Sequence, residues 1–313
     1  MNKVYIIGGA NIDIIGSSLK PLLVHDSNPG KISLSFGGVG RNISENLALL
    51  KEDIYFCSIF SNDSFGKMMI EDLEKKGINI CYSKVVSNYN SSIYLAILDE
   101  KKDMYLGMSD MDILDELDIE TIDKMIKNID NKDTVVLDTN LNENIIKHIC
   151  YNSKGLIVVD PISARKSHKI KEVLNYIDIF KPNKYEAESI SGIYINDIET
   201  ANSCIDYFLK KGVKELVITL GSEGVIAANN MERYWLYHDY VEVVNATGGG
   251  DAFLSAYVKS RINNEDIINS AKYAIGSAVC TVKSLDTVNQ MLCDSIIYEE
   301  LNNLNIKEES LCI

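Results

Sequence analysis

Short apolar segments alternate with amphipathic segments along most of the chain. The amphipathic segments have helical spacing; in residues 64–77, four apolar side chains fall on one helical face: Phe65, Met68, Met69 and Leu73. The apolar segments are short and rich in β-branched residues, as buried parallel strands are, and comprise residues 3–9, 53–60, 133–139, 155–161, 176–183 and 215–221. This alternation predicts an α/β fold with a central, mostly parallel sheet covered by helices on both faces.

Two regions break the alternation. Residues 14–36 and 91–109 have the pattern of β-hairpins with no helix between their strands. They predict a small antiparallel sheet that projects from the main body as a lid. Because the chain shows no linker rich in Pro, Gly or Ser and no internal repeat, we expect one domain over residues 1–313 with two lid insertions.

Composition and charge narrow the classes of partner. Of the 313 residues, 46% are hydrophobic and 24% are charged, which is ordinary for a globular protein with a sizeable core. The formal net charge of −14 disfavours nucleic-acid backbones and anionic membrane surfaces, because both would repel an acidic chain. We therefore expect neither a nucleic-acid nor a membrane partner.

Cysteine and histidine usage argues against a metal or disulfide scaffold. The seven cysteines are scattered without a C-x-x-C pair, and the four histidines stand far apart. The apolar run near the N-terminus is interrupted by glycines and Asp13, and no other apolar window is long enough to span a bilayer. These features predict reduced thiols in a cytoplasmic protein.

Polar residues and glycines follow the first predicted strand, where ligands bind in doubly wound folds. Asn11 and Asp13 alternate onto one side of the chain and suit the recognition of vicinal hydroxyls, or belong to a turn that leads into the lid. Gly37 and Gly38 precede a predicted helix that carries Asn42 in its first turn. This second cluster favours a substrate site, although a glycine pair before a helix also serves packing.

Similar clusters occur in the second half of the chain. Asn183 and Glu186 stand at the entrance to a helix, where a carboxylate also complements the helix dipole. Thr219, Gly221 and Gly224 follow another strand and suit a backbone that passes close to a nucleotide. The P-loop pattern G-x-x-x-x-G-K-[ST] occurs nowhere in the chain.

The segment "NATGGGDAF", residues 245–253, contains the most specific of these clusters. Three consecutive glycines are a poor way to begin an ordinary helix, because each costs roughly 1 kcal/mol relative to alanine in a helix interior. At a helix N-terminus they leave several backbone N–H groups close together and accessible, which makes a binding seat for an anion. Asp251 follows this seat directly.

The order of these motifs resembles the ribokinase-like (PfkB) family of carbohydrate and nucleoside kinases. The motifs are Asn-x-Asp, Gly-Gly-x-x-x-Asn, Asn-x-x-Glu and Thr-Gly-x-Gly-Asp, and the resemblance extends from Val4 to about residue 285. It implies a three-layer α/β/α sandwich with a β lid, and transfer of the γ-phosphoryl group of ATP, with Mg²⁺, to a sugar CH₂OH group. Such a chain is also compatible with a homodimer formed through the β lid.

The resemblance assigns roles to the matching positions. It implies that Asp251 is the catalytic base and that the anion hole is formed by Gly248, Gly249 and Gly250. The sugar would be bound by Asn11, Asp13, Gly38 and Asn42. The ATP phosphates and Mg²⁺, the latter through water, would be held by Asn183 and Glu186, with the nucleotide against Thr219, Gly221 and Gly224.

Two positions depart from the family pattern. Asn245 stands where the family more often has Asp, which leaves open whether the chain has the monovalent-cation site often found in the family. Gly249 stands where Ala is more frequent, and we expect it to be harmless to an anion hole.

The segment "SNPGKISLSFGGVGRNISENLALL", residues 27–50, resembles the pseudouridine kinase branch of the family more closely. The implied reaction is phosphorylation of the 5'-hydroxyl of pseudouridine, with Asn28 on the lid as a candidate for base recognition.

Other activities stay open at this point. Kinases of the ribokinase, adenosine kinase or fructokinase type share these motifs and differ at the lid. A non-catalytic nucleoside sensor on the same fold would have no use for Asp251 beside three glycines. An NAD-linked dehydrogenase is disfavoured, because no strand is followed by G-x-G-x-x-G with a ribose-binding acid downstream.

Overall fold

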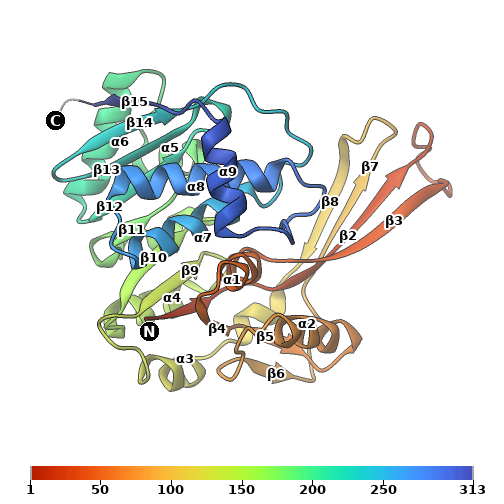
Figure 1. Cartoon of the computed structure of the whole chain (residues 1–313). Coiled ribbons are helices and arrows are strands. Elements are labelled where there is room, and N and C mark those ends of the chain that lie inside the picture. Colours follow the sequence, from red (N-terminus) through yellow and green to blue (C-terminus); the bar gives the residue numbers. More distant parts are fainter. Residues whose placement is uncertain (1, 312–313) are drawn as a thin grey trace.

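The computed structural model describes residues 2–311 and contains a nine-stranded central sheet (Figure 1). The strands are ordered β15-β14-β13-β12-β11-β10-β9-β1-β4. Their bounds are β1 (Lys3–Ile7), β4 (Asp53–Cys57), β9 (Thr134–Asp138), β10 (Leu156–Asp160), β11 (Ile179–Phe180), β12 (Glu215–Thr219), β13 (Val225–Asn229), β14 (Arg233–Tyr237) and β15 (Lys307–Ser310). The six strands from β4 to β12 pair in parallel, and β13 to β15 add antiparallel strands at one edge. The predicted mostly parallel sheet is confirmed.

Helices cover both faces of this sheet and bury a hydrophobic cluster on each side. One face carries α3 (Ile119–Ile126), α4 (Glu143–Asn152), α5 (Lys184–Ser191) and α6 (Ile198–Lys210). The other face carries α1 (Val39–Leu49), α2 (Ser64–Lys75), α7 (Gly249–Ile262), α8 (Ile267–Val282) and α9 (Asp294–Asn303). Neighbouring strand residues such as Val135 and Val136 point into opposite clusters, as the two-residue period requires. The architecture is a three-layer α/β/α sandwich.

A separate four-stranded sheet forms the lid and projects from the body (Figure 1). Its order is β3-β2-β7-β8, with bounds β2 (Asn11–Ser18), β3 (Gly30–Gly37), β7 (Ile93–Leu98) and β8 (Met104–Asp110). The pairs β2–β3 and β7–β8 are antiparallel hairpins, while β2 and β7 join them as a parallel pair. The lid is therefore two hairpins side by side, and the central parallel pair is a feature that the sequence pattern did not indicate.

Two details differ from the sequence pattern. The segment 53–60 breaks after β4, and β5 (Ile59–Ser61) pairs instead with β6 (Lys84–Val86). On α2, Met69 and Leu73 are buried but Met68 is 44% exposed. Met68 lies about 100° around the helix from Met69 and about 140° from Leu73, so it falls outside the buried face.

None of the helices described between residues 2 and 311 combines the length and apolar content that a bilayer crossing requires.

Candidate active site

The glycine turn before Asp251 begins α7 as the sequence predicts. Gly248 caps the helix with φ 84°, and a Cβ atom at this position would lie 1.9 Å from the carbonyl oxygen of Thr287. Both the backbone conformation and the close approach therefore require glycine. Within residues 2–311, no side chain caps this helix, so the first backbone N–H groups of α7 remain free to bind an anion.

Asn42 and Asp251 meet across 209 residues of sequence. The Asn42 Nδ2 atom donates a hydrogen bond of 2.9 Å to Asp251 Oδ2, because α1 and α7 pack side by side. The start of α1 is set by Gly38, whose φ is 101° and whose added Cβ would lie 2.4 Å from the Gly9 carbonyl oxygen. The turn after β1 and the start of α1 thus approach as closely as glycine permits.

Asn11 and Asp13 lie at the start of lid strand β2, beside this contact. Asn11 Nδ2 donates to Asp13 Oδ1 at 2.6 Å, and burial raises the pKa of Asp13 while the Asn11 hydrogen bond opposes that rise. A Cβ at Gly37 would lie 2.2 Å from Asp13 Oδ2, so this glycine makes room for the carboxylate. The structure therefore brings Asn11, Asp13, Gly38, Asn42 and Asp251 together at the carboxyl edge of the parallel sheet.

Asp138, which the sequence motifs did not single out, links both glycine turns. Its Oδ2 atom accepts hydrogen bonds from the Gly9 N–H at 2.8 Å and the Gly40 N–H at 2.9 Å, and its Oδ1 atom accepts from the Asn140 N–H at 2.9 Å. The side chain is buried at the end of β9. The available sequence signal was a single acid at the end of a mostly apolar strand, and Asp160 occupies the same position at the end of β10.

A buried ion pair lies beneath the anion seat. Lys181 Nζ is 2.7 Å from Asp160 Oδ2 and donates to the Gly250 carbonyl oxygen at 3.3 Å. Burial acts to lower the pKa of Lys181, but Asp160 and nearby carboxylates outweigh it and raise the pKa, so the lysine stays charged. For Asp251, burial and then Asp160 raise the pKa to about 7, with the Asn42 hydrogen bond acting in the opposite direction. A carboxyl with this pKa can exchange a proton near neutral pH.

Asn183 and Glu186 form a reciprocal cap at the start of α5. The Asn183 N–H and Nδ2 each donate to Glu186 at 2.8 Å, and the Glu186 N–H donates to Asn183 Oδ1 at 3.0 Å. Burial, followed by Asp160, raises the pKa of Glu186 to about 7. The helix-capping role is thus present in the structure.

The oxygen atoms of Asn183 and Glu186 suit a hard cation such as Mg²⁺. Among residues 2–311, no group of three or more His, Cys, Asp or Glu side chains gathers as a ready metal site. An ion held here would take its remaining ligands from phosphates and water, as Mg²⁺ commonly does.

Thr219 ends β12, and Gly221 and Gly224 follow it. This turn lies beside α5, since Thr219 pairs with Asn183 in an isolated bridge. Gly224 has φ 98°, and its added Cβ would lie 2.0 Å from the Leu236 carbonyl oxygen, whereas the Cβ position of Gly221 (φ 62°) faces open space. Packing against Leu236 therefore requires glycine at position 224, whereas the space beside Gly221 is free.

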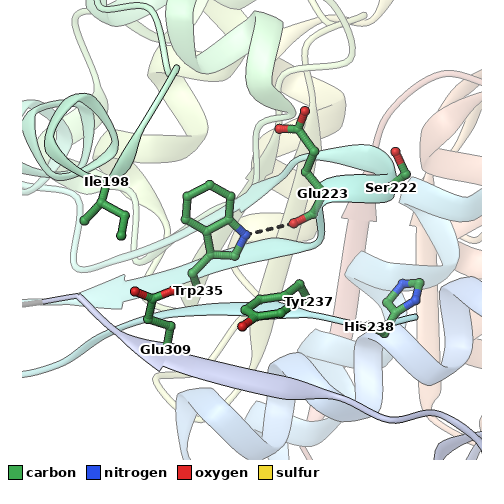
Figure 2. Close-up of a pocket in the computed structure, with 7 residues that line it drawn as sticks. All are labelled: Ile198, Ser222, Glu223, Trp235, Tyr237, His238 and Glu309. Atoms are coloured by element: carbon green, nitrogen blue, oxygen red, sulfur yellow. Dashed lines mark hydrogen bonds between the residues drawn. The ribbon is translucent and has the colours of Figure 1, made fainter. Parts of the chain in front are cut away.

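A surface pocket of about 290 Å³ lies beside the same turn and does not include Asp251 (Figure 2). In it, Trp235 Nε1 donates to the Glu223 carbonyl oxygen at 2.8 Å. The indole thereby supports the turn from one side. The pocket is lined by Ile198, Ser222, Glu223, Trp235, Tyr237, His238 and Glu309.

Asn28 lies apart from the other candidate substrate residues. Its Oδ1 atom accepts from the Leu23 N–H at 2.8 Å, and its Nδ2 atom donates to the carbonyl oxygens of Leu23 and Asp26. It stands beyond the Ser18–Gly30 pair at the lid tip, and Ser18 is already about 16 Å along the strand from Asp13 at 3.3 Å per residue. Asn28 therefore shapes the tip loop, and its amide is occupied by that loop.

The side chain of Asn245 bridges two segments beside α7. Its Nδ2 atom donates to the Leu285 carbonyl oxygen at 3.0 Å, and its Oδ1 atom accepts from the Thr247 N–H at 3.0 Å. The neutral amide thus links the turn before α7 to the segment after α8.

Comparison with known proteins identifies the family of the chain. Residues 1–292 match the model of the pfkB family of carbohydrate kinases. The chain is 34% identical to the pseudouridine kinase of Escherichia coli over 275 residues, which cover 87% of this chain and 88% of the relative.

Solved structures share the fold over nearly the full length. The crystal structure of a Clostridium perfringens protein, 28% identical, superposes with a TM-score of 0.89 and covers 100% of this chain and 99% of its own. Arabidopsis thaliana ribokinase, solved with ribose and ATP, is 19% identical and has a TM-score of 0.84 over 96% of this chain and 99% of its own. The family match over nearly the whole chain, on a fold that already assembles the motif residues, makes this protein a member of the pfkB family of carbohydrate kinases.

Proposed function

We propose that the protein transfers the γ-phosphoryl group of ATP to the 5'-hydroxyl of pseudouridine. The observation that carries the kinase chemistry is the contact between Asn42 and Asp251 at the free N-terminus of α7. The proposed base, Asp251, and the anion-binding N-terminus of α7 then lie beside Asn11 and Asp13 at the start of lid strand β2. The choice of pseudouridine rests on the similarity to the Escherichia coli pseudouridine kinase.

In this proposal, Asp251 accepts the proton of the attacking hydroxyl, which Asn11, Asp13 and Asn42 orient through the sugar. The backbone N–H groups at Gly249 and Gly250 stabilise the charge that spreads over the transferred phosphoryl oxygens. Lys181 adds positive charge beneath the same turn. Because these groups are fixed before the substrates arrive, little reorganisation is needed during the transfer.

ATP would lie along the edge formed by Asn183, Thr219 and the turn from Gly221 to Gly224. Glu186 would hold Mg²⁺ through water, and the ion would neutralise phosphate charge. The capping hydrogen bonds between Asn183 and Glu186 fix the carboxylate in place for that role.

The face of the lid that carries Asp13 is the one we assign to the acceptor. The strand register places four polar side chains in one row across this face: Ser35, Asp13, Tyr94 and Ser109. Tyr94 offers a flat ring beside hydrogen-bonding groups, which suits a nucleobase attached to the bound sugar. The sequence motifs had not identified Tyr94.

We expect pseudouridine to be the preferred acceptor. Pseudouridine exposes an N1–H donor that uridine lacks, and a site group that pairs with it loses its partner when uridine binds. The specificity constant for pseudouridine should therefore exceed that for uridine by at least about tenfold, with free ribose poorer still. The measurement is an ADP-release assay across pseudouridine, uridine, adenosine, ribose and fructose.

The Asn28→Ala variant should lower the pseudouridine-to-uridine ratio more than it slows ribose, because it loosens the lid tip without touching Asp13. If ribose or adenosine proved the best acceptor, the pseudouridine assignment would be wrong and the kinase assignment would stand. A chain that bound nucleosides but released no ADP with any acceptor would instead be a sensor.

We also propose that two copies of the chain pair through the opposite face of the lid. That face carries the rows Leu34, Ile14, Leu95, Met108 and Ile32, Gly16, Ile97, Leu106. Ile32 is 80% exposed and Met108 is 62% exposed, and these rows contain no charged side chain that would oppose self-association.

Sedimentation of the full chain should give twice 35.0 kDa, and Met108→Lys should give the monomer. A monomeric parent chain at micromolar concentration would refute this assembly.

A further inference from the structure

Arg41 is a buried arginine at the start of α1 and lies directly beside the Asn42–Asp251 contact. Its Nη1 atom donates to Asn42 Oδ1 at 2.9 Å and to the Phe36 carbonyl oxygen at 3.1 Å. Its guanidinium group also lies 5.5 Å from the centre of the Phe36 ring, at the end of lid strand β3. Arg41 is 4% exposed and Asn42 is 5% exposed, so neither is a solvated surface group.

The other side of the guanidinium group is held by acids from two helices. Arg41 Nη2 pairs with Glu45 in α1 and with Asp72 Oδ2 in α2 at 3.2 Å. Glu45 Oε1 also accepts from Gln290 Nε2 at 2.8 Å and pairs with Lys76 Nζ at 3.1 Å. The guanidinium group is therefore fixed in position from several directions.

The donor pattern of arginine determines which way the Asn42 amide faces. Arginine has only donors, so the Asn42 atom that faces Arg41 must be the oxygen. The amide nitrogen is then left facing Asp251, where an ionised carboxylate can only accept. Without Arg41, the amide could turn its oxygen toward Asp251, and the hydrogen bond to the carboxylate would be lost.

We propose that Arg41 is a positioning residue for the phosphoryl-transfer reaction: it fixes the Asn42 amide so that its N–H group stays on Asp251. The inference rests on the proposed role of Asp251 as the base. Because Arg41 also holds the end of β3, the same residue ties the lid to the orientation of the base. A purely structural ion pair would support α1 and α2 but would not affect the ionisation of Asp251.

The test is the pH dependence of kcat in the double variant Arg41→Met with Glu45→Met. This pair removes the buried charges together, and Lys76 keeps Asp72 as its partner at 2.5 Å, so the fold should survive. The charged groups that otherwise face Asp251, namely Asp160, Lys181 and Asp138, are unchanged. Loss of a hydrogen bond to the charged carboxylate should shift the acid limb of the profile upward by about one pH unit.

At pH 9, where the carboxylate is ionised in either protein, the loss of turnover relative to the parent should be smaller than at pH 6, because the shift in pKa no longer changes the ionised fraction. Arg41→Lys keeps the charge, but a single ammonium group cannot contact Phe36, Asn42 and Glu45 together. The acid limb should therefore shift in the same direction by a smaller amount. Asp72→Asn weakens the ion pair without touching Asn42 and should leave the acid limb in place.

An unshifted acid limb in the double variant, or a rate lowered equally at every pH, would overturn the positioning role. The proposed function is tested by a different result: if Asp251→Asn kept its turnover, the role of Asp251 as the base would be wrong. The two failures can therefore be distinguished.

Discussion

Replacing Asp251 with Asn should lower turnover by at least about 100-fold, because the substitution keeps size and polarity but removes the proton acceptor. The Asn42 Nδ2 donor would still find an oxygen at position 251, so the packing of α1 on α7 should be preserved. Binding of ATP and of the nucleoside should therefore change little, since neither depends mainly on this carboxylate. Steady-state kinetics with calorimetric binding measurements separate the two effects.

Asp266→Asn is the matched control for this variant. Asp266 also stands at a helix N-terminus, where it accepts from the Asn269 N–H at 2.7 Å, and it is exposed rather than placed at the site. It should leave turnover unchanged. A rate for Asp251→Asn within about threefold of the parent value would mean that another group takes the proton.

Replacing Glu186 with Gln should raise the Mg²⁺ concentration for half-maximal rate by about tenfold. This is the lower end of the effect of losing a residue that contacts a metal through one of its ligands, here water. A glutamine oxygen can still accept one of the two Asn183 hydrogen bonds, so the cap on α5 is weakened rather than lost. The measurement is turnover against Mg²⁺ concentration at fixed ATP, together with the thermal midpoint of unfolding.

Glu188→Gln makes the same change of charge on the same helix. Glu188 accepts from the Ile195 N–H at 2.9 Å and lies outside the Asp160 cluster, so its variant should show the parent Mg²⁺ dependence. If Glu186→Gln lowered the unfolding midpoint but left the Mg²⁺ dependence unchanged, Glu186 would serve only as the helix cap.

The fold and the glycine turns could be predicted from the sequence because each is encoded locally. Short β-branched runs alternate with helical periods, and the turns at Gly38 and Gly248 have positive φ angles that glycine adopts without strain. The predicted starts of α1, α5 and α7 all follow from such local signals.

The links between these turns were not predictable in the same way. Asn42 and Asp251 are 209 residues apart, and a single sequence has no period or spacing that encodes their contact. Asp138 and Lys181 each appear as one charged residue after an apolar strand, and only the packed sheet shows that they hold the glycine turns. The parallel β2–β7 pair was missed because hairpin patterns specify partners within a hairpin, not between two of them.

The lid lies within residues 11–110, whereas the groups assigned to ATP and the anion seat all follow residue 180. The two sets are contributed by different parts of the chain and meet mainly where α1 packs on α7. Mutations toward the tips of the two hairpins, away from Phe36 and Arg41, can therefore accumulate without disturbing the phosphoryl-transfer groups. Such a division lets acceptor preference drift during evolution while the ancestral chemistry is inherited intact, so relatives with similar catalytic turns can diverge in the molecules they phosphorylate.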